Sequence, residues 1–220
     1  MPEGPGPFPG VVVAQHLPIA HAGLEKDPFT IDVAERLAKA GYASVTPHVF
    51  HWWDAEEDIA VKREGFRDDR AVADMNAAYD MLARSDKVDS TRIGVIGHCW
   101  GGRISWLHAC HNADYKALVT LYGGRIKLGM GDGAIAPINL CSRIACPVMG
   151  IFGNDDANPS PADVDDLGAA LAKASVPHTF HSYDGAGHGF QDFVNPDRFR
   201  EEAAADAWQK LLAFLDDNLK

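Results

Sequence analysis

Short apolar runs alternate with longer segments of helical periodicity along almost the whole chain. Strand-like runs lie near residues 11–15, 43–46, 92–97, 117–122, 147–152 and 178–183. Helices are predicted over residues 29–40, 68–84, 101–110, 161–174 and 197–217. Strands that alternate with helices in this way are typical of a parallel sheet covered by helices. The pattern therefore predicts an α/β fold, a mostly parallel sheet with helices on both faces.

Length and composition indicate how this fold is organised. The chain has 220 residues, of which 46% are hydrophobic, and this is enough for one α/β domain with a sizeable core. No internal repeat, low-complexity segment or domain boundary interrupts the alternation. We therefore expect a single domain over residues 1–220.

The charge balance narrows the possible partners. The net charge is −11, whereas nucleic-acid and anionic-membrane surfaces need a basic patch, so we expect neither partner. Residues 1–10 lack a signal-peptide pattern and no apolar stretch is long enough to span a bilayer, so we expect a cytoplasmic protein. Of the four cysteines, Cys110, Cys141 and Cys146 form no Cys-x-x-Cys pair and are expected to be reduced.

The most informative segment is Gly97-His98-Cys99-Trp100-Gly101-Gly102, between a predicted strand and a predicted helix. Small residues on both sides of a nucleophile at such a junction are typical of a nucleophile elbow. The free N–H groups and the dipole at the start of the helix stabilise an anion. The sequence therefore predicts a nucleophilic thiolate at Cys99. The N–H of Trp100 would point at the oxyanion formed on an attacked carbonyl.

Two later segments supply partners for this nucleophile. Asp155 follows the predicted strand 147–152 in a turn-rich loop, with Asp156 as the alternative acid. His188 lies in the glycine-rich segment 185–190, where packing gives little reason for a histidine. The order nucleophile, acid, base along the chain is that of α/β-hydrolases. Together these residues predict a Cys-His-Asp triad.

The elbow with its cysteine, the Gly153-Asn154-Asp155 turn and the segment Gly185-Ala186-Gly187-His188-Gly189-Phe190 resemble the dienelactone hydrolase family. The resemblance extends from about residue 9 to the C-terminus and implies an α/β-hydrolase fold. It implies Cys99 as the nucleophile, His188 as the base and Asp155 as the acid. It also implies an oxyanion hole made by the N–H groups of Leu17 and Trp100, and places Tyr122 near the pocket.

The chain departs from the family pattern at three places. His16 stands where the family has a glutamate that holds the resting cysteine, and a protonated imidazole there could pair with a thiolate. Asp192 stands where the family has a substrate-binding arginine, so Arg63, Arg67 or Arg70 would have to supply the cation. Little of the chain precedes the first strand. We then expect the strand near residues 44–46 to form an exposed sheet edge, which favours a homodimer, with a monomer as the alternative.

Aromatic residues in two further segments are candidates for the pocket wall. Trp52, with the neighbouring aromatic residues, follows the second predicted strand and could line the pocket mouth, as could Phe190 in the histidine segment. His48, His51 and Asp54 could form a metal site, but such a group in a loop is more often solvated or pocket-lining. We expect no metal site and no cofactor.

These observations predict a hydrolase that cleaves an activated ester or lactone through a thioester acyl-enzyme. One alternative is a thioesterase or general carboxylesterase that uses the same triad. A non-enzymatic alternative is a redox or ligand sensor in which Cys99 is oxidised or capped. A complete triad favours catalysis.

Overall fold

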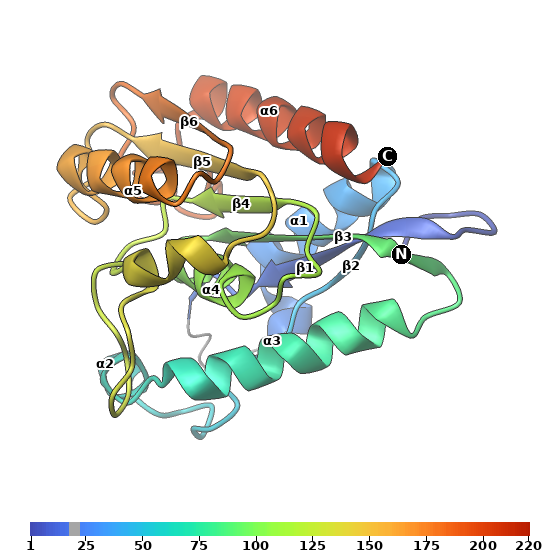
Figure 1. The fold of residues 1–220 in the computed structure, drawn as a ribbon, viewed down its shortest axis with the longest axis horizontal. Helices are drawn as coiled ribbons and strands as arrows, with labels where there is room; N and C mark the ends of the chain where they lie inside the picture. Colours follow the sequence, from blue (N-terminus) through green and yellow to red (C-terminus); the bar gives the residue numbers. More distant parts are fainter. Residues whose placement is uncertain (18–22) are drawn as a thin grey trace.

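The computed structural model describes residues 1–17 and 23–220. Six strands form one sheet in the order β2-β1-β3-β4-β5-β6, and every neighbouring pair is parallel (Figure 1). Their bounds are β1 Phe8–Ala14, β2 Ala43–Val45, β3 Val88–His98, β4 Leu118–Leu121, β5 Val148–Gly153 and β6 His178–Tyr183. All six predicted strands are confirmed, although β1 and β3 each begin a few residues earlier than expected.

The helices also follow the predicted order. They are α1 Pro28–Lys39, α2 Ile59–Glu64, α3 Asp68–Ala83, α4 Trp100–Ala109, α5 Pro161–Lys173 and α6 Glu201–Leu219, with 3-10 turns at Leu24–Lys26 and Pro137–Arg143. The five predicted helices are confirmed. Helix α6 begins later than residue 197, because residues 196–198 form a turn. Helix α2 was not predicted, since six residues are too few to show a helical period.

Helices cover both faces of the sheet, as predicted. Alternate residues of β1 point to opposite faces: Val11 and Val13 pack in the core that contains residues of α1 and α6, while Val12 and Ala14 pack in the core beneath α3 and α4. Figure 1 shows α6 on one side of the sheet and α3 on the other. Because both faces of the sheet are covered, the buried strands are nearly continuous apolar runs in the sequence.

Because all strands are parallel, their carboxyl ends meet at one edge of the sheet. The segments after β1, β3, β5 and β6 begin there, and this is where ligands bind in open α/β sheets. Strand β2 lies at an edge of the sheet, as expected, and the homodimer stays a prediction. In the described parts of the chain, no helix combines the length and apolar character needed to cross a bilayer.

Candidate active site

The turn from β3 to α4 presents Cys99 at the carboxyl edge of the sheet. Cys99 has a φ of 55°, and its N–H donates to the carbonyl of Leu121 at the end of β4, at 2.9 Å. A non-glycine residue in this region of backbone space costs about 1–3 kcal/mol and persists only where the surroundings hold it. The predicted elbow is therefore present, with its strain at the residue that carries the thiol.

Two glycines of the elbow are required by close backbone contacts. A Cβ atom on Gly97 would lie 2.0 Å from the carbonyl oxygen of Gly101, and one on Gly101 would lie 2.2 Å from that of Ala14. Neither gap admits a methyl group. The first turn of α4 can thus lie directly against the ends of β1 and β3.

The imidazole of His188 lies between the Cys99 thiol and a buried carboxylate. Its Nε2 atom lies 2.9 Å from Cys99 Sγ, and its Nδ1 atom lies 2.9 Å from Asp156 Oδ2. The Asp156 side chain is only 2% exposed, whereas Asp155 is exposed to solvent. The choice of Asp155 as the acid is therefore wrong in geometric terms: the carboxylate that contacts His188 belongs to Asp156.

The turn after β5 explains this one-residue difference. The Asp155 N–H donates to the carbonyl of Ala186, at 3.0 Å, which ties the backbone of this turn to the histidine segment. The next residue, Asp156, then points inward, and its Oδ1 atom accepts the N–H of Asn158 at 2.8 Å. Both carboxylate oxygens of Asp156 are thus bonded, and its side chain cannot rotate freely.

The surroundings of His188 favour its charged form. Burial disfavours an imidazolium, but the hydrogen bonds and charges of Asp156 and Cys99 outweigh burial and raise the pKa of His188 from 6.5 to about 10. At neutral pH the histidine is therefore held as an imidazolium against the sulfur. This is the electrostatic setting in which a cysteine serves as a nucleophile.

Two aromatic residues support the imidazole from behind. The ring of Tyr122 is fully buried and lies edge-on to His188, with centroids 5.5 Å apart, and Phe190 packs edge-on to Tyr122 at the same distance. Neither residue lines the cavity at Cys99. Tyr122 and Phe190 were expected to line the pocket; the structure instead packs Tyr122 against the His188 imidazole and Phe190 against Tyr122.

The predicted oxyanion hole is not open in this conformation. The N–H of Trp100 donates to the carbonyl of His16 at 3.0 Å, so it is not free for a substrate. Leu17 lines the cavity, and its N–H has no acceptor among residues 1–17 and 23–220. The two predicted residues are therefore adjacent to the thiol, but the Trp100 donor is already occupied.

A cavity of about 400 Å³ opens beside the thiol. Arg63, Arg125 and Arg198 lie on its wall, and no carboxylate forms an ion pair with any of them in the described part of the chain. The remaining lining residues are Leu17, Cys99, Trp100, Gly124, Asp156, Ala157, Asn158 and His188. Among the lining residues that the structure describes, Asp156 is the only acid, and it is bonded to His188, so the unpaired charge on this part of the wall is positive.

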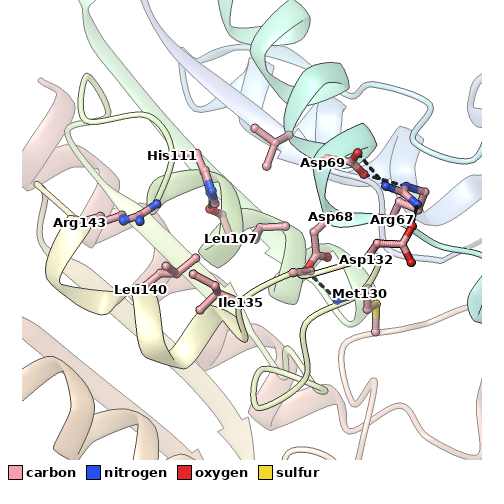
Figure 2. A pocket seen from close by; sticks show the side chains of 13 residues that line it. Arg67, Asp68, Asp69, Leu107, His111, Met130, Asp132, Ile135, Leu140 and Arg143 are labelled. Atoms are coloured by element: carbon pink, nitrogen blue, oxygen red, sulfur yellow. Dashed lines mark hydrogen bonds and ion pairs between the residues drawn. The ribbon is translucent and has the colours of Figure 1, made fainter.

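Of the predicted substrate-binding residues, Arg63 lines this cavity. Arg67 instead pairs with Asp69 and Asp132, both at 3.1 Å, in a separate pocket shown in Figure 2. Arg70, the third candidate cation, stacks on the ring of Trp52. The expectation for Arg67 is wrong because two carboxylates already hold its guanidinium.

The expectations for His16 and Trp52 are also wrong. His16 Nε2 lies 2.9 Å from Asp27 Oδ2, and its ring packs against Phe29, so the imidazole faces α1 rather than the thiol. Trp52 donates its indole N–H to Asp74, at 3.3 Å, on the outer surface. Neither side chain lines the cavity at Cys99.

Asp192 does not line the cavity either. Its carboxylate accepts the N–H of Val194 at 3.1 Å, and it is absent from the lining. The Asp192 carboxylate is therefore bonded within a local turn and is not part of the cavity wall.

Three residues of the cavity wall were not predicted from the sequence: Arg125, Arg198 and Asn158. Arg125 follows the end of β4 by four residues, and its position just beyond a strand's carboxyl end is a signal that could have found it. Asn158 accepts the Arg125 N–H at 3.0 Å, which joins the loops after β4 and β5. Arg198 lies in a turn before α6 and carries no recognisable signal.

The proposed alternative of a metal cluster gains no support from the structure. His51 Nε2 bonds to Asp74 Oδ1 at 3.0 Å, on the surface. Across residues 1–17 and 23–220, no group of three histidine, cysteine or acidic side chains is arranged to hold a metal ion.

Comparison with known proteins agrees with this fold and identifies the family. The family model described as "Dienelactone hydrolase family" matches residues 1–219. A protein of Methylorubrum extorquens named "Putative carboxymethylenebutenolidase" is 31% identical, over 96% of this chain and 72% of its own length. The carboxymethylenebutenolidase of Rhodococcus opacus is 29% identical, over 86% of this chain and 75% of its own length.

A solved structure carries the same architecture. The crystal structure named "Putative Dienelactone Hydrolase" from Klebsiella pneumoniae matches with a TM-score of 0.85 and 28% identity, over 97% of this chain and 89% of that one. The parallel sheet, the elbow and the extent of these matches lead to one assignment: the chain has the α/β-hydrolase fold and belongs to the dienelactone hydrolase family.

Proposed function

We propose that this hydrolase cleaves an activated ester or lactone through Cys99, His188 and Asp156, with a thioester acyl-enzyme as the intermediate. The observation that carries the proposal is the continuous contact from thiol to imidazole to buried carboxylate, with both distances at 2.9 Å. Asp156 orients the imidazole and favours its charged form, so that His188 presents Nε2 to the sulfur.

The reaction has two steps. The Cys99 thiolate adds to the carbonyl carbon, the bond to the leaving oxygen breaks, and the His188 imidazolium gives that oxygen its proton. A thioester and a neutral imidazole result. His188 then takes a proton from water, the hydroxide adds to the thioester, and the carbon–sulfur bond breaks. The acid is released, and the thiolate and imidazolium are restored.

The charges of the cavity favour an anionic substrate. Arg63, Arg125 and Arg198 come from three different segments, and each guanidinium is without a carboxylate partner in the described residues. On a protein of net charge −11, three such cations around one nucleophile attract an anion to it. The relatives are named carboxymethylenebutenolidases, a name that specifies an unsaturated lactone with a carboxylate. A carboxylate-bearing enol lactone fits this cavity by charge.

The test is hydrolysis of paired substrates, each with a neutral and a carboxylate-bearing member, by wild type, Cys99→Ser, Cys99→Ala and His188→Ala. Turnover by wild type that is lost in Cys99→Ala and His188→Ala would support the proposal, as would trapping of the thioester. Faster turnover of acyl-thioesters than of lactones would favour a thioesterase. Ready alkylation of Cys99 with no turnover of any substrate would favour a sensor.

A further inference from the structure

The carbonyl of His16 occupies the place that a substrate oxyanion needs. This carbonyl accepts the Trp100 N–H at 3.0 Å, next to the Cys99 thiol. An oxyanion formed at Cys99 is also a hydrogen-bond acceptor, and it would have to use the same N–H. The two acceptors compete for one donor, so the conformation described here cannot stabilise the tetrahedral intermediate through Trp100.

One peptide group contains both the carbonyl that occupies the Trp100 N–H and a second N–H that an oxyanion needs. The His16 carbonyl and the Leu17 N–H belong to the same planar peptide group, in which C=O and N–H point in opposite directions. With the carbonyl toward Trp100, the Leu17 N–H faces away from that position. Rotation of this single plane would release the Trp100 N–H and bring the Leu17 N–H toward the oxyanion.

The residues on both sides of this plane are held by side chains. Gln15 is buried; its Nε2 donates to the Leu17 carbonyl at 2.8 Å, and its Oε1 accepts the Val49 N–H at 3.0 Å. On the other side, the His16 imidazole bonds to Asp27, which caps α1 by accepting the Thr30 N–H. The peptide plane between two anchored residues can rotate while its neighbours keep their places.

We propose that the His16–Leu17 peptide rotates when substrate arrives and completes the oxyanion hole, and that Gln15 is the positioning residue that guides this rotation. The inference rests on the proposed function at Cys99. A neutral carbonyl on Trp100 is exchanged for an oxyanion held by two N–H groups. Hydrogen bonds to an ionised acceptor are roughly twice as strong as neutral ones, so the exchange favours the rotated form only while the oxyanion is present.

The decisive contrast is between two reactions of the same thiolate. Acylation by p-nitrophenyl acetate forms an oxyanion, whereas alkylation by iodoacetamide displaces iodide at a saturated carbon and forms none. Gln15→Leu removes the bonds to Leu17 and Val49, and Gln15→Glu keeps an acceptor for Val49 but loses the donor to Leu17. Both variants are expected to lower the acylation burst rate by about 10- to 100-fold, at or below the loss for a deleted oxyanion donor.

Gln15→Leu adds no ionisable group and should alkylate at the wild-type rate with the wild-type pH dependence. Asn218→Leu is the matched control, because Asn218 is also a side-chain amide that donates to a backbone carbonyl, that of Phe214 in α6. It should change neither rate. An acylation rate unchanged in Gln15→Leu, or acylation and alkylation that fall together, would overturn the role of Gln15.

The rotation itself is tested without turnover. A trifluoromethyl ketone adds to a cysteine to give a stable anionic adduct, and the crystal structure of that adduct should show the Trp100 and Leu17 N–H groups on its oxygen. A His16 carbonyl still bonded to Trp100 in the adduct would overturn the rotation. Wild type that forms the adduct but hydrolyses no ester would contradict only the proposed function. Failure of Cys99 to add to the ketone would count against both.

Discussion

Asp156 Oδ2 lies 2.9 Å from His188 Nδ1, while the side chain of the preceding Asp155 points into solvent. Two adjacent residues of the same type thus have different environments. Asp156→Asn should lower kcat by roughly 10³-fold or more, because the neutral amide no longer stabilises the imidazolium and can favour the wrong tautomer. Asp155→Asn is the matched control and should stay within about twofold of wild type. Steady-state hydrolysis of one p-nitrophenyl ester distinguishes them, and a larger loss in Asp155→Asn would contradict the geometry.

The raised pKa of His188 sets an upper pH limit for acylation. In the proposed mechanism the His188 imidazolium supplies the proton to the leaving group, so the burst rate should fall as pH rises through about 10. A raised folded-state pKa also means that the stability contributed by this group is complete below 6.5 and is lost as pH rises from 6.5 through about 10. Urea unfolding of wild type and His188→Ala across this window should converge toward high pH, and a constant difference would contradict the prediction.

Two glycine-to-alanine substitutions, one at the elbow and one inside α5, should have opposite effects on the free energy of unfolding. In Gly101→Ala the new Cβ would lie 2.2 Å from the Ala14 carbonyl oxygen, so α4 must shift away from β1. We expect a loss of about 1–3 kcal/mol in unfolding free energy and about 100-fold in kcat/KM. Gly168→Ala, inside α5, meets nothing closer than 3.6 Å and should stabilise by about 0.5–1 kcal/mol with unchanged activity. Urea titration and ester hydrolysis measure both, and an equally stable Gly101→Ala would refute the steric argument.

A buried ion pair holds the loop that carries Arg125. Arg103, on α4, forms a two-pronged bond to Asp68 at 2.6 and 3.0 Å, and it also donates to the carbonyls of Arg125 and Leu128. Arg103→Leu leaves the Asp68 carboxylate buried without its partner. The free energy of unfolding should fall by about 3–5 kcal/mol, measured by urea denaturation.

The control for Arg103→Leu is an exposed ion pair. Arg84 pairs with Asp80 at the end of α3, and its side chain is 80% exposed. Arg84→Leu should change the unfolding free energy by about 0.5 kcal/mol or less. Similar losses in the two variants would show that the burial of the Asp68–Arg103 pair is unimportant.

Because three arginines line the cavity, we expect the enzyme to prefer substrates that carry a negative charge. Single substitutions of these arginines should weaken this preference. Arg63→Gln and Arg198→Gln should each lower kcat/KM for an ester with a free carboxylate by about 3- to 10-fold. The neutral ester of equal length should change by less than about twofold. The preference should also shrink as salt is added, because exposed charges are screened. Equal losses on both esters would indicate a structural role for these arginines instead.

The sequence by itself determined the order of the elements and the elbow. The alternation of apolar runs with helical periods depends on local geometry, and it predicted every strand and the five longer helices. The elbow was equally readable, because only glycine allows the approaches at Gly97 and Gly101. The positions of Cys99 and His188 followed from such local signals, and the structure brings the two side chains together.

Only the tertiary structure decided which neighbouring residue enters the site. The choice between Asp155 and Asp156 depends on a backbone bond from Asp155 to Ala186, some thirty residues later in the chain. Arg67 is excluded because Asp132, distant in sequence, holds its guanidinium. The direction of the His16–Leu17 peptide depends likewise on its bond to Trp100. Side-chain and peptide directions in loops are set by long-range hydrogen bonds, which residue order and periodicity do not encode.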